Sequence, residues 1–323
     1  MPARIETVAS FAKGLDVIRS FGVDARRQTI TEVAARTGMT RAGARRFLHT
    51  LVEEGYARSD GKHFELTARV LELGNAYISG MTELETVRDI LQDLTRELGE
   101  SASAATLDGP DIIYVARSPA RHRLMTIGIA VGTRLPAHAT SMGQAILAQL
   151  SQNEFDRFMK ESRLEKLTDR TLTSREALRA RLAQVREQGY AVVSEELEVG
   201  VRSIAVAIPG RPANARLAIN LSAQAGRISA EEMVAPFLPH LKRADAILYV
   251  RRLAAVAHAR GLAFGLKNAS EMSRDPKVMA VSDFTITEDC FAQGWCADSR
   301  NFIAAGKPVF ALEYTDNAIG FAA

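Results

Sequence analysis

The sequence predicts an α+β chain of several domains, and three observations support this. Over the first hundred residues, apolar side chains recur every three or four positions, the period of amphipathic helices. Between residues 101 and 221, short apolar runs are separated by turn sequences such as Asp108-Gly109-Pro110-Asp111, which indicates an antiparallel sheet. Beyond residue 250, helical and strand-like runs alternate, which favours parallel strands. We therefore predict domains at 1–80, 101–250 and 251–323, with residues 81–100 as a helical linker.

Composition bounds the classes of protein to which the chain can belong. Its 323 residues exceed one typical domain, and 47% hydrophobic with 24% charged residues is ordinary for a globular protein. The net charge of +3 excludes a histone-like polycation. No apolar run approaches the roughly 18 residues of a membrane span, and the N-terminus lacks a signal-peptide core. We expect a cytoplasmic protein with no membrane partner, in which Cys290 and Cys296 imply no disulfide framework.

Residues 29–56 carry the most specific pattern of the chain. A first helix over residues 11–21 precedes a capping box, Thr29 with Glu32, which begins a short helix that ends at Gly38. Thr40 can cap the next helix, whose apolar stripe consists of Ala44, Phe47, Leu48 and Leu51. Its opposite face presents Ala42, Arg45, Arg46 and His49, with Arg41 in the first turn. Two short helices, a glycine-containing turn and a basic outer face predict a helix-turn-helix, whose second helix enters the major groove of DNA.

A hairpin follows this motif directly. Residues 56–66 read as two strands with Asp60-Gly61 at the tip, so the unit is a winged helix and Lys62 can contact the DNA backbone or minor groove. Residues 26–49 contain six arginines and one acid, as phosphate binding requires, although an amphipathic helix with arginines is often only a solvated surface helix. The expected partner is a double-stranded DNA operator. The candidate DNA-binding residues are Thr29, Thr40, Arg41, Ala42, Arg45, Arg46, His49 and Lys62.

Helical patterns continue over residues 67–79 and 83–98. In the second, Leu84, Val87, Leu91, Leu94 and Leu98 form a stripe that either belongs to the core or packs against a partner chain. Because one short recognition helix reads little sequence, we expect a homodimer. The middle domain then contributes helices and strands to an antiparallel sheet. The expected strands are 101–107, 112–117, 124–131, 191–195, 203–208 and 216–221, and the expected helices are 140–150, 174–188 and 229–248.

Residues 8–250 resemble the IclR family of bacterial transcriptional regulators. The matching segments are TITEVAARTGMTRAGARRFLHTLVEEGY, FELTARVLELG, VGTRLPAHATSMGQAILA and EELEVGVRSIAVAI. Within that family the chain is most similar to the branch that governs aromatic-acid catabolism through the β-ketoadipate pathway. The resemblance implies an N-terminal winged helix, a GAF-like effector domain and assembly as dimers or tetramers. The implied function is a ligand-responsive, sequence-specific regulator of transcription.

The segment 138–143 and the segment 199–204 lie beside the effector pocket that this resemblance implies. Thr140 or Ser141 can cap a helix whose first amides and dipole suit a carboxylate, and Gly143 would let a ligand approach the backbone. A plain helix cap without a ligand is the alternative, and Arg202 could equally be a surface charge. The candidate effector-binding residues are Thr140, Ser141, Met142, Gly143, Arg202 and Ser203, with a small organic acid as effector. We find no catalytic motif and no metal-ligand spacing among the histidines, and we expect no cofactor.

The tail after residue 250 differs in pattern from the rest. Helices at 251–261 and 297–306 alternate with strands at 262–268, 282–290 and 307–314. The segments GLKN, SDFTITEDC and FIAAGKPVF resemble the C-terminal part of the endo-α-1,4-polygalactosaminidase family of glycoside hydrolases, which are TIM barrels. Polar residues stand at the strand ends, as barrel active sites require: Lys267, Asn268, Glu288 and Glu313.

A complete barrel needs eight strands and about 250 residues, and glycoside hydrolysis needs two carboxylates at a fixed separation. We therefore expect a partial α/β, truncated TIM-barrel-like tail that is catalytically inactive. Such a fragment should either pack less well than residues 101–250 or dock onto a neighbour. Glycoside hydrolase activity of this tail is the alternative function, and the absence of most of the barrel disfavours it.

Overall fold

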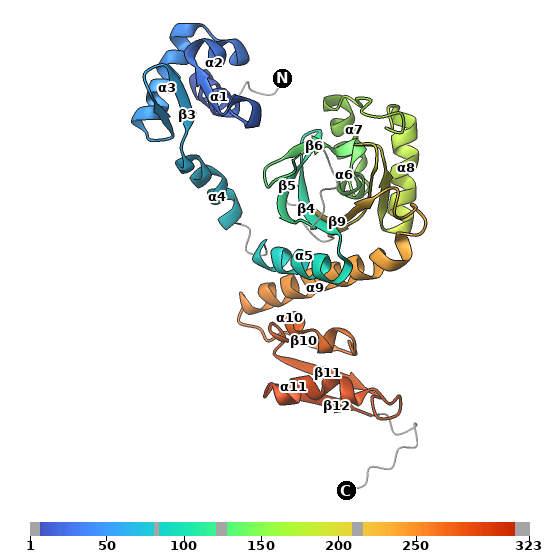
Figure 1. Ribbon diagram of the computed structural model, residues 1–323. Helices are drawn as coiled ribbons and strands as arrows, with labels where there is room; N and C mark the ends of the chain where they lie inside the picture. The colour runs from blue at the N-terminus through green and yellow to red at the C-terminus, as the bar shows by residue number, and fades with distance from the viewer. Residues whose placement is uncertain (1–6, 81–83, 121–127, 209–215, 314–323) are drawn as a thin grey trace. The chain divides into compact units, whose positions relative to one another are not determined.

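The computed structural model describes residues 7–80, 84–120, 128–208 and 216–313 of the chain. The chain divides into two compact units, residues 1–82 and residues 83–323, each described by itself below. Figure 1 shows both units, with labels on many of their helices and strands. In the described part of the chain, no helix is both long enough and apolar enough to cross a bilayer.

The first unit is a helical bundle with a small three-stranded sheet. Its elements are α1 (Ala9–Arg19), η1 (Val23–Ala25), β1 (Arg27–Thr29), α2 (Ile30–Thr37), α3 (Arg41–Glu53), β2 (Ala57–Ser59), β3 (His63–Leu66), η2 (Ala68–Val70) and α4 (Leu71–Ser79). The sheet is antiparallel in the order β1-β3-β2. Its core consists of Val17, Val33, Ala34, Ala44, Leu48 and Phe64, contributed by α1, α2, α3 and β3. The predicted winged helix-turn-helix is confirmed.

Local capping positions the two helices of this motif. The amide N–H of Glu32 donates to the Thr29 hydroxyl at 3.4 Å, and the Glu32 carboxylate accepts the Thr29 amide at 2.7 Å. Gly38 ends α2 in the left-handed region at φ +65°, which a glycine adopts without strain. Thr40 then accepts the amide of Gly43 at 3.1 Å. These contacts satisfy helix donors that would otherwise have no partner, and they fix the turn between α2 and α3.

The second unit is built around a six-stranded antiparallel sheet. Its strands are β4 (Ser101–Asp108), β5 (Asp111–Ser118), β6 (Arg134–Pro136), β7 (Ala191–Ser194), β8 (Val201–Ile208) and β9 (Leu217–Gln224). They lie in the order β6-β5-β4-β9-β8-β7. The strand predicted at 124–131 is not present over residues 128–131, and residues 121–127 lie outside the described residues. Strand β6, which pairs with β5, was not predicted from the sequence.

Helices cover both faces of this sheet. The helices before the tail are α5 (Leu84–Leu98), η3 (Ala137–Ala139), α6 (Ser141–Leu147), α7 (Gln152–Glu161), α8 (Arg175–Gln188) and α9 (Val234–His258). Helix α6 lies within the curl of the sheet, while α5 and α9 lie side by side along the outer face (Figure 1). The α5 stripe is buried within its own chain, since Leu84, Val87, Leu91 and Leu94 are at most 4% exposed. This stripe therefore belongs to the core, and the alternative of a partner chain packing on it is wrong.

The predicted boundary at residue 250 falls inside a helix. Helix α9 runs without interruption from Val234 to His258, whereas the sequence analysis expected separate helices at 229–248 and 251–261. Ser229 and Glu232 exchange capping contacts, but both residues lie in a turn ahead of the helix. No glycine or proline lies between residues 240 and 260, so nothing ends the helix until Gly261, which has φ +70°.

The tail is a small parallel α/β unit, as predicted. Its elements are β10 (Gly265–Lys267), η5 (Met272–Arg274), α10 (Pro276–Met279), β11 (Phe284–Glu288), η6 (Cys296–Ser299), α11 (Arg300–Ala304) and β12 (Val309–Leu312). The strands are parallel in the order β10-β11-β12. With three strands in the described part of the tail, the expected relation to a TIM barrel is not confirmed. Cys290 and Cys296 form a disulfide across the turn that follows β11, which the sequence analysis did not anticipate.

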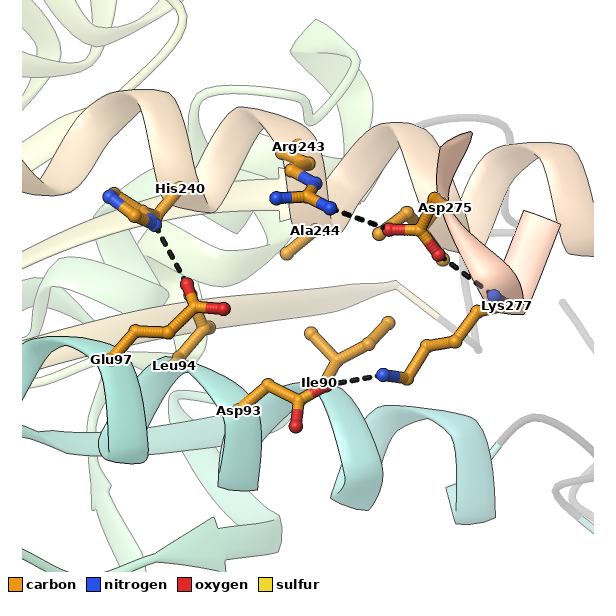
Figure 2. Close-up of a pocket in the computed structure, with 10 residues that line it drawn as sticks. Ile90, Asp93, Leu94, Glu97, His240, Arg243, Ala244, Asp275 and Lys277 are labelled. Atoms are coloured by element: carbon orange, nitrogen blue, oxygen red, sulfur yellow. Dashed lines mark hydrogen bonds and ion pairs between the residues drawn. The ribbon is translucent and has the colours of Figure 1, made fainter. Parts of the chain in front are cut away.

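The tail docks onto α5 and α9. Figure 2 shows charged side chains from both helices facing the start of α10. Arg243 of α9 contacts Asp275 at 2.9 Å, and Lys277 pairs with Asp93 of α5. Arg251 also donates to the carbonyl of Lys277 at 2.9 Å. Of the two expected behaviours, the structure therefore shows docking onto a neighbour.

Candidate functional site

The outer face of α3 is exposed and basic. Arg41, Ala42, Arg45, Arg46 and His49 are all exposed, while Ala44 and Leu48 on the opposite side are fully buried. His49 packs edge-on against Phe64 of β3, with ring centroids 5.8 Å apart. Within the described residues, none of the three arginines of this face forms an ion pair. Their guanidinium groups are therefore available to an anionic partner.

The wing carries a compact turn at its tip. One carboxylate oxygen of Asp60 accepts the amides of Lys62 at 2.9 Å and His63 at 2.7 Å. These backbone hydrogen bonds lower the pKa of Asp60. Gly61 has φ +95°, so the tight turn requires a glycine there. The result is a rigid tip from which the exposed Lys62 projects.

The arginines around the wing differ from those on α3, because they are paired. Arg27 contacts Asp60, and Glu65 binds Arg26 at 3.1 Å and Arg58 at 3.0 Å. Ion pairs thus neutralise the arginines around the wing, whereas the arginines on the outer face of α3 have no such partner among the described residues. Of the predicted DNA-binding set, Thr29 and Thr40 act as helix caps in the structure, and Arg41, Ala42, Arg45, Arg46, His49 and Lys62 are exposed.

The start of α6 is buried and already capped by the protein. Thr140, Ser141 and Met142 are each at most 5% exposed, and the Thr140 hydroxyl accepts the Gly143 amide at 3.2 Å. A Cβ at position 143 would collide with the backbone of Ala137. Packing against Ala137 therefore explains the glycine, in place of the ligand approach that the sequence suggested. The Ser141 hydroxyl, in contrast, is buried with no hydrogen-bond partner among the described residues.

A buried polar network connects α6 and α8 to His138 and Glu196. Gln144 donates to the His138 carbonyl at 2.9 Å and to the Glu196 carboxylate at 2.9 Å, and Arg181 of α8 also binds Glu196 at 2.9 Å. Burial raises the pKa of Glu196, against the opposing effect of Arg181. Burial likewise lowers the pKa of His138, whose ring contacts the Glu165 carbonyl at 3.1 Å. The polar groups of this network have hydrogen-bond partners within the protein. We therefore assign them a structural role and not a role in ligand binding.

The sheet face that α6 covers carries several polar side chains, although the face of a sheet that packs against a helix is usually apolar. Asn220 lies opposite Ser103 on one side and opposite Ala205 on the other, and Ser203 pairs in register with Ser222. Directly opposed residues share a face of an antiparallel sheet, and Ala205 belongs to the core beneath α6. The Asn220 amide donates to Ser222 at 3.1 Å, while its buried oxygen has no partner in the described chain.

Arg117 joins this face because of a bulge. The register between β4 and β5 shifts so that Val115 is an extra residue, and Arg117 lies opposite Ser103 on the same side as Tyr114. Burial lowers the pKa of Arg117, and burial raises the pKa of Tyr114 to about 12. The guanidinium donates to the Ile129 carbonyl at 3.3 Å, but its Nε is buried without a partner among the described residues. No described carboxylate pairs with it.

The structure separates Arg202 from this group. Side chains alternate along β8, so Arg202 lies on the opposite face from Ser203. Its guanidinium donates to Ser194 at 2.9 Å, to the Ala225 carbonyl at 3.1 Å and to the Ile228 carbonyl. Arg202 therefore ties β8 to the segment before α9 and does not reach the face beneath α6.

Four residues of this face were not predicted from the sequence: Ser103, Arg117, Asn220 and Ser222. A signal was available for Asn220 and Ser222, because both are polar and alternate within an otherwise apolar strand. The position of Arg117 had no such signal, because regular alternation from Tyr114 would turn residue 117 to the other face.

Three of the four polar residues predicted at the C-terminal ends of the tail strands contact one another, and the fourth, Glu313, has a different partner. Glu288 binds Lys267 at 2.8 Å and Asn268 at 3.1 Å. Glu313 accepts the amide of Phe291 at 2.9 Å, beside the disulfide. The ion pair with Lys267 therefore neutralises the charge of Glu288 within the protein.

Family models match most of the chain. The model described as IclR helix-turn-helix domain matches residues 10–61, and that described as Bacterial transcriptional regulator IclR C-terminal matches residues 75–247. The model of Glycoside-hydrolase family GH114 matches residues 238–322. The last two matches overlap within α9, the helix that joins the sheet domain to the tail.

Individual proteins agree with these matches. The Pca regulon regulatory protein of Pseudomonas putida is 41% identical over 238 residues, which is 74% of this chain and 82% of that protein. The p-hydroxybenzoate hydroxylase transcriptional activator of Acinetobacter baylyi is 34% identical over 239 residues, covering 73% and 88%. The crystal structure of a transcriptional regulator from Rhodococcus sp. RHA1 has 44% identity and a TM-score of 0.65, covering 75% of this chain and 97% of that one.

Proposed function

The chain belongs to the IclR family of bacterial transcriptional regulators, and we propose that it binds a double-stranded DNA operator and responds to a small aromatic acid. The observation that carries the first part is the α3 face, where Arg41, Arg45 and Arg46 are exposed and unpaired among the described residues. A helix with this face fits the major groove, and free guanidinium groups bind phosphates or guanine edges. We place this activity in the cytoplasm, where the chromosomal DNA lies.

Selection from random DNA tests this activity and identifies the operator at the same time. The full-length chain is used to select duplexes from a random pool, and the enriched sequence is titrated at several salt concentrations. We expect one enriched motif with two-fold symmetry, bound about 10³-fold or more tighter than unrelated DNA at physiological salt. Enrichment of no motif, with equal affinity for all duplexes, would exclude a specific regulator.

The proposed effector site is the polar face beneath α6. It combines one cation, Arg117, with the buried polar groups of Ser103, Ser141 and Asn220. The half-buried hydroxyls of Ser203 and Ser222 lie on the same face. Buried polar atoms nearly always have hydrogen-bond partners, so the unpartnered atoms of Arg117, Ser141 and Asn220 indicate a place for a ligand. A guanidinium in partly desolvated surroundings, with no described carboxylate beside it, favours an anionic ligand.

The ligand class is narrowed by the relatives. One is named a p-hydroxybenzoate hydroxylase transcriptional activator and another a Pca regulon regulatory protein, at 34% and 41% identity. Together with the apolar residues of the α6 core, which include Met142, Ile112 and Tyr114, the site suits a ring that carries a carboxylate. Calorimetric titration of the full chain with benzoates, and with ring-opened dicarboxylic acids of similar size, tests this. Binding of neutral analogues alone would refute the assignment.

Self-association is proposed to involve α4 and not α5. The α5 stripe is internal, but α4 exposes Leu71 (74%), Leu73 (49%) and Tyr77 (52%). Exposed apolar groups of this size on one short helix are typical of an interface. We propose that α4 contributes to a homodimer, alone or within a tetramer. Light scattering should give a multiple of the chain mass, and Leu71→Glu combined with Tyr77→Glu should reduce it.

We propose that the tail carries no hydrolase activity. Its match to a glycoside-hydrolase family covers residues 238–322, but the described tail provides three strands. Lys267 also neutralises Glu288, which accepts a further hydrogen bond from Asn268. Incubation of the full chain with a galactosamine polymer should release no reducing ends. Release that disappears in Glu288→Gln would establish the enzymatic alternative.

A further inference from the structure

Two sulfur atoms and a carboxylate meet where two strands of the tail end. Cys290 follows β11, Cys296 begins η6, and Glu313 follows β12. One ligand atom from each lies within 4.8 Å of the other two. Cys290 is buried at 2% exposure, and the other two residues are half-buried. This cluster lies outside the DNA-binding face and outside the proposed effector site.

The surrounding backbone holds these three residues in place. The Phe291 amide donates to one oxygen of Glu313 at 2.9 Å, and the Trp295 amide donates to the Cys290 carbonyl at 2.9 Å. The Thr287 hydroxyl contacts the Cys290 sulfur at 3.4 Å. The ligand atoms therefore come from three segments that the parallel sheet and its turns keep together.

The second oxygen of Glu313 points to a missing partner. It is buried and has no hydrogen-bond partner in the described part of the chain. A buried carboxylate oxygen costs free energy unless a donor or a cation meets it. The uncharged disulfide next to Glu313 supplies neither.

We propose that the reduced chain uses Cys290, Cys296 and Glu313 as a three-ligand site for a zinc-type divalent ion. Two thiolates and one carboxylate suit Zn²⁺, whereas Mg²⁺ and Ca²⁺ prefer oxygen ligands alone. Zinc is commonly bound tetrahedrally by Cys sulfur and carboxylate oxygen, and three protein ligands leave the fourth position for water. The inference does not depend on the DNA-binding or effector proposals.

Reduction and metal binding are coupled through the same sulfurs. A thiol-class reductant supplies two electrons and two protons, so the S–S bond breaks and two thiols form. Each thiol then releases its proton to solvent as its sulfur binds the ion. Because a disulfide sulfur is not a thiolate, zinc and the disulfide exclude each other. Occupancy of the site is thus governed by the redox state of the chain, and cytosolic thiols are normally reduced.

The test uses the full-length chain in both redox states. One sample is reduced with a phosphine and freed of metal, the other is oxidised, and each is titrated with Zn²⁺ against a chromophoric chelator. The reduced chain should bind one Zn²⁺ that the oxidised chain does not bind. Co²⁺ added to the reduced chain should give thiolate-to-cobalt charge-transfer absorption, which reports sulfur ligation directly.

Single substitutions identify the ligands. Cys296→Ser should weaken Zn²⁺ binding by at least about 100-fold and Glu313→Gln by at least about tenfold, since even outer-shell partners of metal ligands contribute about 10- to 100-fold. Glu271→Gln changes an exposed carboxylate of the tail and serves as the matched control, with unchanged affinity expected. Thermal unfolding of each metal-free variant shows whether its fold is retained. No uptake by the reduced wild-type chain, equal uptake by the oxidised chain, or full affinity in Cys296→Ser would each overturn the proposal.

Discussion

Arg117 is the residue on which the effector proposal depends most. Replacement by Met keeps the length and apolar packing of the side chain and removes its charge. Because a hydrogen bond to a charged group contributes about 1.5–3 kcal/mol, Arg117→Met should weaken binding of an aromatic acid by roughly 10- to 150-fold. Calorimetry on the full chain measures this, with the paired and exposed Arg134→Met as control.

The same calorimetric experiment distinguishes Arg117 from Arg202 as the residue that binds the carboxylate of the effector. Arg202 is engaged by Ser194 and two carbonyls on the other face of the sheet. Arg202→Met should therefore lower stability and leave the affinity of the folded protein intact. Loss of affinity in Arg202→Met, with none in Arg117→Met, would place the carboxylate elsewhere.

Gly143 is predicted to matter for stability. An added Cβ meets the backbone of Ala137, which cannot move as a flexible side chain would. Gly143→Ala should lower the free energy of unfolding by about 1–3 kcal/mol, the usual cost of overpacking. Urea denaturation measures the change, and Gly226→Ala, where the added methyl meets nothing within 4 Å, is the matched control. Equal stability of the two variants would contradict the packing argument.

Glu154 makes stability depend on pH in a defined direction. Arg216 binds both of its carboxylate oxygens at 3.0 Å, and these bonds with those from Ser151 lower the pKa of Glu154 from 4.5 to about 2. A depressed carboxyl pKa gives stability that is fully present above pH 4.5 and lost as pH falls towards 2.

Glu154→Gln should therefore unfold more easily than the wild type at pH 7, by about 1–3 kcal/mol. The difference should shrink as the pH is lowered through 4 towards 2. Melting temperatures of both proteins across this range provide the measurement. A difference that stays constant with pH would show that the ion pair is not its source.

Residue contacts were predictable where they are local in sequence. The caps at Thr29 and Thr40 involve partners three positions away, and both are present. The orientation of Arg117 depends on one extra residue in a strand, and the need for Gly143 depends on a carbonyl that folding brings against it. Neither can be read from periodicity.

At the scale of elements, α3 provides the clearest prediction. Arg45→Ala and Arg46→Ala should each reduce operator affinity by about 1–3 kcal/mol if the side chain reads a base. A side chain that contacts only phosphate should instead weaken all duplexes equally and reduce the salt slope by about one. Titrations of operator and unrelated duplex distinguish these cases.

Arg26→Ala is the control for these variants, because Arg26 is exposed in the same unit but is paired with Glu65. Its effect on operator affinity should be smaller than that of either α3 substitution. If Arg45→Ala and Arg46→Ala both bind the operator as the wild type does, α3 is not the reading helix.

The starts of α2 and α3 were predicted from their caps at Thr29 and Thr40, but two other helix ends were not predicted. Helix α7 begins with a capping box, Ser151 with Glu154, that the sequence analysis overlooked. The break placed at residue 250 followed the limits of two family resemblances, although no helix-breaking residue lies there. The boundary between two family resemblances can thus lie within a single helix. Capping and helix-breaking residues are the better guide to where a helix begins and ends.

At the scale of the molecule, the order of domains could be predicted but the docking of the tail could not. Lys277 and Asp93 are 184 positions apart in sequence, and both are common surface residues. Nothing in their local pattern indicates that they meet. Asp275, at 5% exposure, shows that the contact is more than incidental, because a buried carboxylate requires partners such as Arg243.

This docking predicts that the position of a truncation matters. A chain ending at Gly261 keeps all of α9 but loses Lys277 and Asp275, which pair with Asp93 and Arg243. Its second unit should therefore melt a few degrees lower, at about 2–4 °C per kcal/mol lost. A chain ending at Val250 also loses the last two turns of α9 with the buried Ala254, and should melt lower still. Operator affinity should be retained in both, because residues 1–82 form their own compact unit. Calorimetric melting and operator titration of the three chains test this, and a Val250 truncation as stable as the full chain would show that the tail contributes nothing to the fold.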